Sequence, residues 1–346
     1  MLRGAVAEVY RLAKIPDPLP DKSDAESSEQ TAGALLHHHS KQLATALNLD
    51  CGGARIEVQC LLQAVLQVNC TRLLTHPEQP LNLEQYARYA ALFERRLSGE
   101  PIAYLLGERE FFGLNFKVSP ATLIPRPDTE LLVELALARI PPPSPPAPLP
   151  VPAGGIPAAS GSKAARTGET GEGGRKAGRG YRVLDLGTGS GAVALSIAHA
   201  RPDVAVTAVD ASQDALEVAQ FNAQRLNLDN MRLLHGDWFS ALGQECFDLI
   251  VSNPPYIAAG DVHLSRGDLR FEPHAALASG ADGLDDMRRI VAQARAHLNV
   301  GGWLLLEHGY DQADRVRALL QQAGFTQVCS ARDLAGTERV SCGLAS

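Results

Sequence analysis

Short apolar runs alternate with helical segments through the second half of the chain, and this alternation restricts the fold more than any other feature. The runs read as strands at 182–185, 204–209, 231–234, 247–251 and 303–307. Strands separated by helices pair in parallel, because the chain must cross over to return to the same edge of the sheet. Two more runs, 325–329 and 339–342, are expected to add an antiparallel edge. The sequence therefore predicts an α/β domain over residues 181–346, with a mostly parallel seven-stranded sheet.

A glycine-rich segment follows the first of these strands. Gly187-Thr188-Gly189-Ser190-Gly191 leads directly into a helix, so its backbone can approach a ligand closely at the helix N-terminus. Similar loops occur at nicotinamide and flavin sites, and the loop alone does not specify the ligand. It does mark the carboxyl ends of the strands as the place where an open parallel sheet binds ligands.

Three further residues at strand ends narrow the choice of ligand. Asp210 ends the second strand, where a carboxylate can accept hydrogen bonds from both hydroxyls of a ribose. Asp237 and Trp238 follow the third strand and offer a carboxylate for an adenine amino group and an indole for its face. Two of them have a simpler alternative, since Asp210 could cap the next helix and Trp238 could belong to the core. Their occurrence together favours ligand binding.

The fourth strand runs into Asn253-Pro254-Pro255-Tyr256, a loop suited to holding a planar nitrogen. An amide or aryl-amine nitrogen is a poor nucleophile, because its lone pair is delocalised into the neighbouring carbonyl or ring. The Asn253 side-chain oxygen and the Pro254 carbonyl could accept its two N–H bonds, which orients the nitrogen and favours charge developing on it. Tyr256 could lie against the planar group. The loop indicates a methyltransferase active site, although a Pro-rich turn capped by asparagine uses the same residues.

The sequence before residue 108 is expected to form a variable segment, 1–40, and a helical domain, 41–107. The variable segment contains His37-His38-His39, which has no further ligand at a useful spacing and is expected to belong to a mobile tail. Asn82 is positioned to begin a helix that Gly99 ends. The aromatic stripe of that helix is more typical of a core than of a binding surface: Tyr86, Tyr89 and Phe93.

Residues 108–140 are expected to form a hairpin around Gly113 and then a connecting helix. A segment with two prolines, 124–130, precedes that helix, and Asp128 is positioned to cap it. This segment either only starts the helix or helps to shape the mouth of the active site. Residues 141–180 are rich in Pro and then in Gly, Ala and Ser, a composition typical of a disordered insertion.

Charge and hydropathy restrict the class of protein. No apolar run approaches the roughly 18 residues of a membrane span, and the first residues carry charge, so we expect a cytoplasmic protein, with an Arg-rich transit peptide as the alternative. From residue 181 the chain has 13 Arg, no Lys and 20 acidic residues, so its whole net charge of −7 lies there. This acidity argues against a nucleic acid as the direct substrate. The six cysteines show no metal-ligand spacing, and no metal is expected.

Several short motifs together carry a resemblance to a known family. They are Pro101-Ile102-Ala103-Tyr104, Leu123-Ile124-Pro125-Arg126-Pro127-Asp128-Thr129-Glu130, Asp185-Leu186-Gly187-Thr188-Gly189-Ser190-Gly191, Asn253-Pro254-Pro255-Tyr256, Phe271-Glu272-Pro273 and Leu306-Glu307-His308-Gly309. This combination closely resembles the PrmC/HemK family of peptide chain release factor glutamine methyltransferases. The match runs from about Gly53 to the C-terminus. The resemblance implies a class I S-adenosylmethionine-dependent methyltransferase domain with a Rossmann-like sheet, behind a small N-terminal helical domain that helps to dock the release factor.

The resemblance also implies roles for the site residues. The loop from Gly187 to Gly191 would cradle the methionine part of S-adenosylmethionine, Asp210 would hold the ribose, and Asp237 and Trp238 would border the adenine. Asn253 to Tyr256 would hold the glutamine of the release factor's Gly-Gly-Gln motif, with Asn253 also next to the cofactor. Asn253 and Pro254 are the expected catalytic residues, acting in a direct displacement at the sulfonium methyl by the amide nitrogen. A monomer is expected.

Two other functions remain open at this point. An amino methyltransferase acting on DNA or RNA uses the same Asn-Pro-Pro-Tyr loop, although the acidic second half argues against it. A nucleotide-binding or scaffold protein without methyl transfer would lack affinity for S-adenosylmethionine. The first forty residues and the insertion at 141–180 depart from the family pattern. Neither touches a motif, so they leave partner contacts undetermined and do not affect the expected chemistry.

Overall fold

The computed structural model describes residues 30–143 and 180–346. Most of the segment expected to be variable and nearly all of the insertion expected at 141–180 therefore lie outside the described residues. The chain divides into two compact units, Met1–Leu106 and Gly107–Ser346, and each has its own hydrophobic core. In the described part of the chain, no helix is both long enough and apolar enough to cross a bilayer.

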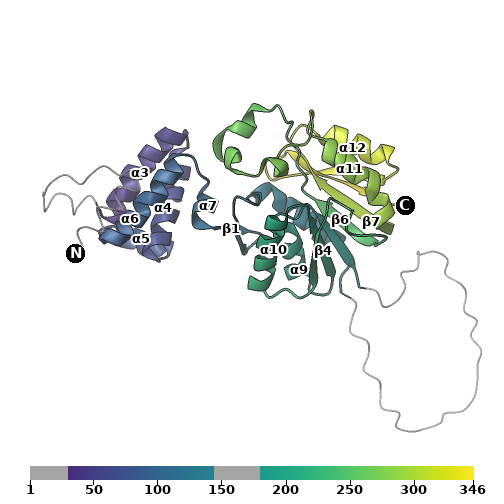
Figure 1. Cartoon of the computed structure of the whole chain (residues 1–346), viewed down its shortest axis with the longest axis horizontal. Helices are drawn as coiled ribbons and strands as arrows, with labels where there is room; N and C mark the ends of the chain where they lie inside the picture. Colours follow the sequence, from purple (N-terminus) through teal and green to yellow (C-terminus); the bar gives the residue numbers. More distant parts are fainter. Residues whose placement is uncertain (1–29, 144–179) are drawn as a thin grey trace, which may run out of the picture. The chain divides into compact units, whose positions relative to one another are not determined.

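The first unit is helical, and its longer helices begin at polar capping residues. From residue 30 on, its helices are α3 (Ala32–Leu47), α4 (Cys51–Leu66), α5 (Cys70–Thr75), α6 (Leu83–Leu97) and α7 (Ile102–Leu106) (Figure 1). The N-cap side chains of the first four each accept a hydrogen bond from a backbone N–H of the first turn: Thr31, Asp50, Asn69 and Asn82. In α6 the Gln85 side chain also accepts from the Asn82 backbone N–H, which completes a capping box.

Helix α3 begins well inside the segment that was expected to be a tail, so that prediction is wrong for residues 32–40. The His39 ring stacks on Phe93 with centroids 4.1 Å apart, and its Nδ1 lies 2.8 Å from the Tyr89 hydroxyl oxygen. Burial lowers the pKa of His39 to about 4, so the imidazole is neutral at pH 7. Tyr89 and Phe93 are buried, which confirms that the aromatic stripe belongs to a core. The polar residues of α3 obscured an apolar face that includes Leu35, Leu36 and Leu43.

The second unit begins with the hairpin of β1 (Glu108–Phe111) and β2 (Leu114–Lys117), whose turn places Gly113 at φ 76°. A 3₁₀ turn, η1 (Pro127–Thr129), then leads into α8 (Glu130–Arg139). Asp128 lies within this turn and makes no capping hydrogen bond, so the prediction that it caps the helix is wrong. The turn starts at Pro127, one residue before Asp128. The Asp128 carboxylate instead pairs with Arg339 at 3.1 Å.

Seven strands form the sheet of the second unit, in the order β5-β4-β3-β6-β7-β9-β8. They are β3 (Arg182–Leu186), β4 (Ala205–Asp210), β5 (Met231–His235), β6 (Phe247–Ser252), β7 (Leu298–Glu307), β8 (Thr326–Arg332) and β9 (Glu338–Leu344). Strands β3 to β7 pair in parallel, and β9 pairs antiparallel with β7 and β8. This confirms the predicted sheet. Strand β7 starts earlier than predicted, at Leu298, because Gly301 and Gly302 weaken its sequence pattern.

Helices cover both faces of the sheet: α9 (Ala192–Ala200), α10 (Gln213–Arg225), α11 (Asp285–Ala294) and α12 (Ala313–Gln322), together with α8 (Figure 1). Successive strand residues point to opposite faces. Val183 belongs to the core that includes residues of α8 and α9, whereas Leu184 belongs to the core that includes residues of α11 and α12. The irregular segment between β6 and α11 holds three 3₁₀ turns, η2 (Val262–Ser265), η3 (Gly267–Phe271) and η4 (His274–Ala276), and η5 (Arg295–His297) follows α11.

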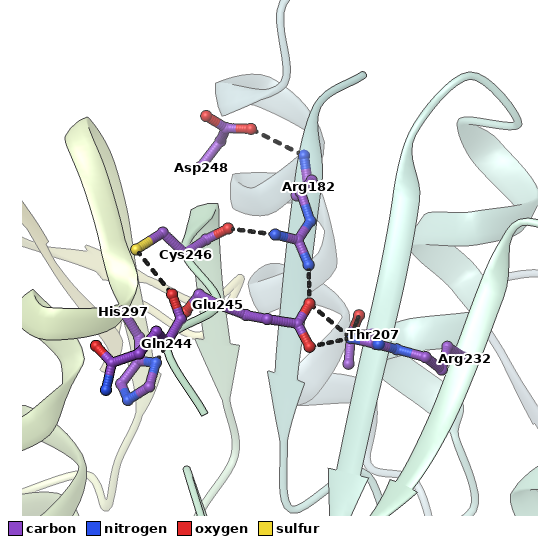
Figure 2. A network of polar contacts seen from close by, with 8 residues as sticks. All are labelled: Arg182, Thr207, Arg232, Gln244, Glu245, Cys246, Asp248 and His297. Atoms are coloured by element: carbon purple, nitrogen blue, oxygen red, sulfur yellow. Dashed lines mark hydrogen bonds and ion pairs between the residues drawn. The ribbon is translucent and has the colours of Figure 1, made fainter. Parts of the chain in front are cut away.

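A polar network joins the amino ends of several strands (Figure 2). Glu245 pairs with Arg182 at the start of β3, and its Oε2 accepts a hydrogen bond from Arg232 of β5 at 3.0 Å. Arg182 also donates to the Cys246 carbonyl at 2.8 Å, and its backbone N–H donates to Asp248 Oδ2 at 2.9 Å. Hydrogen bonds from Arg232 and Arg182 hold the pKa of Glu245 below its usual value. The network holds together the amino ends of the strands, and the predicted site lies at their carboxyl ends.

Candidate active site

A cavity of about 410 Å³ opens at the carboxyl ends of the parallel strands. The strand order reverses here, since β4 lies on one side of β3 and β6 on the other, and such a point leaves a crevice. The volume suits a small molecule. Predicted site residues from all four strand ends contribute to its lining: Gly187, Gly189, Asp210, Asp237, Trp238, Asn253 and Pro255. The structure therefore brings together motifs that are far apart in the sequence.

The glycine-rich loop after β3 uses backbone angles that favour glycine. Gly187 has φ 72° and Gly189 has φ 58°, in the left-handed region. A Cβ atom at Gly187 would lie 3.3 Å from the Trp238 ring, so the ring and the loop backbone are in close contact. The backbone N–H groups of Gly187 and Thr188 donate to the Val209 carbonyl at 2.9 and 3.0 Å, which fastens the loop to β4.

Three residues of the predicted loop are not among those that line the cavity: Thr188, Ser190 and Gly191. Thr188 is buried, and its hydroxyl donates to Asp185 Oδ2 at 2.7 Å. The Ser190 carbonyl accepts a hydrogen bond from the Asn222 side chain at 2.9 Å. Burial raises the pKa of Asp185 to about 7, and the Thr188 hydrogen bond opposes this shift. These residues support the backbone of the loop, and within the loop Gly187 and Gly189 line the cavity.

Asp210 at the end of β4 uses both carboxylate oxygens to fasten neighbouring backbone. Its Oδ2 accepts from the Gly189 N–H at 2.8 Å, and its Oδ1 accepts from the Ser212 N–H at 2.9 Å. The N-cap of α10 is Ser212, whose side chain accepts from the Ala215 N–H, so the alternative that Asp210 caps this helix is wrong. The carboxylate lines the cavity and keeps capacity for further donors, because each oxygen can accept more than one hydrogen bond.

Trp238 and Asp237 line the cavity beside the glycine loop. Trp238 is half-buried and also packs against the core that includes residues of α11 and α12. Its indole Nε1 is buried and has no hydrogen-bond partner among the described residues. The Asp237 carboxylate pairs with Arg289 of α11, which also pairs with Asp286 at 3.4 Å. Sequence reasoning missed Arg289, because its position within an amphipathic helix is typical of a solvent-exposed residue.

Asn253 stands where two cavities meet. It lines the larger cavity, and it also lines a smaller one of about 60 Å³ together with Pro254 and Tyr256. Its Nδ2 donates to Thr129 Oγ1 at 3.2 Å. Among the described residues none donates a hydrogen bond to the Pro254 carbonyl. The loop thus presents an amide and a backbone carbonyl at the junction of the two cavities.

The carbonyl of Tyr256 accepts a hydrogen bond from Gln312 Nε2 at 2.9 Å, and Gln312 Oε1 accepts from the Gly309 N–H at 2.9 Å. The glutamine side chain therefore anchors the end of the Asn-Pro-Pro-Tyr loop to the turn after β7. Burial raises the pKa of the Tyr256 hydroxyl above its usual value. Tyr256 is neutral at physiological pH, and its ring helps to line the smaller cavity.

The segment with two prolines shapes the mouth of the site. Leu123, immediately before this segment, lines both cavities, and Arg126 within it lines the smaller one. The buried Glu272 accepts from the Ile124 N–H at 3.0 Å and pairs with Arg126, so it ties this segment to the chain after η3. Burial raises the pKa of Glu272, and the Arg126 charge opposes the shift. Of the two alternatives left open for the segment, the structure favours a role at the mouth of the site.

Glu307 ends β7 and is buried behind Asn253, with 2% of its surface exposed. Burial raises its pKa to about 7, and hydrogen bonds from Thr129 and Asn253 oppose that shift. Sequence reasoning did not select Glu307 as a site residue. A signal was present, since it is a carboxylate at a strand end like Asp210, but its burial beside the Asn253 loop depends on the pairing of β6 with β7.

The raised pKa of Glu307 predicts a pH-dependent stability. Its folded-state pKa of about 7 exceeds the ordinary value of 4.5, so folding favours the protonated form. The stabilisation is complete below about pH 4.5 and is lost as the pH rises through 7. Glu307→Gln removes the ionisation and is expected to gain about 3 kcal/mol relative to the original chain between pH 4 and pH 8.

Urea unfolding of the two proteins at several pH values measures this difference. Both tryptophans, Trp238 and Trp303, lie in the α/β unit, so their fluorescence reports its unfolding. The shift of Asp185 is present in both proteins and cancels in the comparison. Parallel stability curves from pH 4 to pH 8 would show that Glu307 titrates at its ordinary value.

Comparison with known proteins gives consistent matches. The model of the PrmC N-terminal domain matches residues 34–107, and the model of the Methyltransferase small domain matches residues 175–269. The release factor glutamine methyltransferase of Salmonella typhimurium is 45% identical over 308 residues, which are 89% of this chain and 96% of that protein. The proteins of that name from Bordetella pertussis and Pseudomonas aeruginosa are 47% and 46% identical, over 85% of this chain and 96% and 94% of their own lengths.

Proposed function

Because the chain belongs to the release factor glutamine methyltransferase family, we propose that it transfers a methyl group from S-adenosylmethionine to the side-chain amide nitrogen of a glutamine in a peptide chain release factor. The acceptor is the glutamine of the release factor's Gly-Gly-Gln motif. The observation that carries the proposal is the position of Asn253, which lines both the larger cavity and the smaller one beside it. One cavity takes the cofactor and the other takes the glutamine side chain.

The residues of the larger cavity fit S-adenosylmethionine. Gly187 and Gly189 line the cavity without side chains, so the loop backbone can approach the methionine part of the cofactor. Both have positive φ angles, which glycine adopts without strain. Asp210 has acceptor capacity left for the two ribose hydroxyls. The Trp238 ring borders the adenine, and the Asp237–Arg289 pair closes that end of the cavity. When bound, the cofactor supplies an electrophilic methyl group on a positively charged sulfur.

The Asn-Pro-Pro-Tyr loop orients the acceptor. Asn253 Oδ1 and the Pro254 carbonyl accept the two N–H bonds of the glutamine amide, so the nitrogen lone pair is directed at the methyl group. Both acceptors also stabilise the positive charge that develops on the nitrogen during transfer. The Tyr256 ring lies against the planar amide. No side-chain base is required, because the methylated nitrogen is acidic enough for water to take its proton.

The proposal extends to partners and location. The direct substrate is a protein, because the chain from residue 181 carries an excess of acidic residues and no Lys, which is unfavourable for gripping phosphates. We also propose that the protein works in the cytoplasm, and that one copy of the chain is sufficient for activity. The described residues contain no helix suited to cross a membrane.

Transfer of labelled methyl from S-adenosylmethionine tests the proposal directly. The acceptors are a purified bacterial release factor and a copy in which the Gly-Gly-Gln glutamine is alanine. Label on the first alone supports both the reaction and the acceptor. Label on neither, with cofactor binding intact by calorimetry, would overturn the proposal and direct the search to nucleic acids.

Asp210→Asn is expected to weaken binding of S-adenosylmethionine about 10- to 100-fold. An asparagine would replace one acceptor with an N–H donor that faces the Gly189 or Ser212 N–H, and it would lose an acceptor for the ribose. Calorimetry measures the dissociation constant. Asp203→Asn is the matched control, because Asp203 pairs with Arg201 before β4, at the opposite edge of the sheet. Equal dissociation constants for both variants would exclude a cofactor role for Asp210.

A further inference from the structure

The proposed chemistry depends on which end of the Asn253 amide faces the cavities. The oxygen and the NH₂ group of an asparagine have nearly the same shape, so packing alone does not distinguish the two orientations. Only the orientation with Oδ1 toward the acceptor nitrogen can receive its N–H bond. In the reverse orientation the Asn253 NH₂ group would face the N–H donors of the glutamine and oppose its binding. Some feature of the protein must select the productive orientation.

The side chains behind Asn253 offer different partners to the two ends of its amide. Asn253 Nδ2 donates to Thr129 Oγ1 at 3.2 Å. The buried carboxyl of Glu307 lies next to Asn253 through the pairing of β6 with β7, and Thr129 and Asn253 act on it as donors that favour its ionised form. A hydroxyl has one proton, and Thr129 uses it toward Glu307, so its oxygen is left to accept from Asn253. The Asn253 NH₂ group therefore faces two acceptors, the Thr129 oxygen and the Glu307 carboxyl.

Reversal of the amide would be unfavourable in this setting. The Asn253 oxygen would then face two acceptors, the Thr129 oxygen and the Glu307 carboxyl, inside the protein. Buried polar atoms that lose their partners are costly, because no water replaces them. The Glu307 Oε2 atom is buried and has no partner among the described residues, so it can carry a proton without displacing a donor. The arrangement therefore holds whether Glu307 is protonated or ionised.

Three separate elements produce this cluster. Ser252 of β6 pairs with Leu306 of β7 in parallel register, which puts the next residues, Asn253 and Glu307, side by side. Thr129 is the last residue of η1, and the turn places its buried side chain against Asn253. Other charged groups act on Glu307 from nearby elements, namely Asp128 and Arg339, which pair with each other at 3.1 Å.

We propose that Thr129 and Glu307 are positioning residues that hold the Asn253 amide with its oxygen toward the acceptor nitrogen. The inference rests on the proposed function, since it assigns the orientation of that site. Neither residue touches the acceptor. Both act through Asn253, and their contribution is confined to the step in which the acceptor nitrogen is oriented.

Thr129→Val tests the inference with little change of shape, because valine replaces the hydroxyl by a methyl group. We expect the turnover number for a release factor to fall about 10- to 100-fold, with little change in the dissociation constant of S-adenosylmethionine. Thr129→Ser restores the hydroxyl and is expected to recover most of the activity. Thr326→Val, in the edge strand β8, is the matched control and keeps the original turnover.

Glu307 is tested by a second pair of variants. Glu307→Gln keeps an oxygen that accepts both hydrogen bonds and puts its NH₂ group where Oε2 has no partner, so near-original turnover is expected. Glu307→Leu removes both acceptors and is expected to lower turnover at least as much as Thr129→Val. Thermal melting identifies any variant that fails to fold. If Glu307→Leu fails to fold, the result for Thr129→Val decides the inference.

A double variant, Thr129→Val combined with Asn253→Ala, distinguishes positioning of Asn253 from a general structural effect. If Thr129 acts only through Asn253, then Thr129→Val lowers turnover no further in the Asn253→Ala background. An equal further loss in that background, or original turnover in Thr129→Val alone, would overturn the inference while leaving the proposed function intact. If the original chain transfers no methyl group to the release factor, the proposed function fails and the inference falls with it.

Discussion

Replacing Asn253 with alanine is expected to lower the turnover number about 10²- to 10³-fold and to leave the affinity for S-adenosylmethionine nearly unchanged. The side chain supplies one of the two acceptors proposed to orient the glutamine amide and to stabilise the charge that develops on its nitrogen. Alanine removes that acceptor, and water that enters the space is not held in a fixed direction. The loss therefore falls on the transfer step, because the cofactor keeps its contacts with the loops after β3, β4 and β5.

Single-turnover kinetics with a release factor, combined with calorimetry for the cofactor, measures the two effects separately. Asn299→Ala is the matched control, since the Asn299 amide donates to Asp248 Oδ1 at 3.0 Å at the amino edge of the sheet. It removes the same group far from the cavities and is expected to retain the original rate. Original turnover in Asn253→Ala, or a loss confined to cofactor affinity, would contradict the role proposed for Asn253.

Alanine at Gly283 is expected to destabilise the α/β unit by about 3 kcal/mol and to remove most of the activity. Gly283 has φ 76°, which is unfavourable for a residue with a side chain. A Cβ atom there would also overlap the Tyr256 carbonyl oxygen and lie 2.8 Å from Gln312 Nε2. It would break the hydrogen bond that anchors the Asn-Pro-Pro-Tyr loop, and the loop would move.

Gly336→Ala separates the cost of a side chain at positive φ from the cost of overlap with neighbouring atoms. Gly336 has φ 83°, and a Cβ atom there would have no neighbour within 4 Å. This control carries the backbone cost alone, about 1 to 2 kcal/mol, and is expected to keep the original turnover. Urea unfolding followed by tryptophan fluorescence measures stability, and methyl transfer measures activity. If Gly283→Ala behaves like Gly336→Ala in both, the proposed overlap with the loop does not disturb the site.

Local sequence patterns were sufficient for much of the fold. The parallel order of β3 to β7 follows from apolar runs separated by helices, and the antiparallel edge follows from the two short runs near the C-terminus. Each of the four motifs stands directly after a strand, so its place at one edge of the sheet follows from the strand itself. These predictions succeeded because each depends on residues that are close together in the sequence.

Predictions failed where a residue has two local interpretations. His39 lies in a run of polar residues, yet it stacks on Phe93 of another helix, and that contact cannot be read from its neighbours. Asp128 has the residue type of a helix cap but falls within a 3₁₀ turn and pairs with Arg339. In the glycine loop the pattern did not distinguish Gly187 and Gly189, which line the cavity, from Thr188, which points to Asp185.

The sequence by itself determined the class of fold, the edge of the sheet that carries the site and the loop that ends in Asn253. Only the tertiary structure decided which residues stand behind that loop. Thr129 and Glu307 lie 124 and 54 positions away from Asn253 in the numbering, and the register of β6 on β7 and the turn before α8 bring them together. The physical reason is that periodicity reports one element at a time, whereas hydrogen bonds between buried side chains depend on how elements pack.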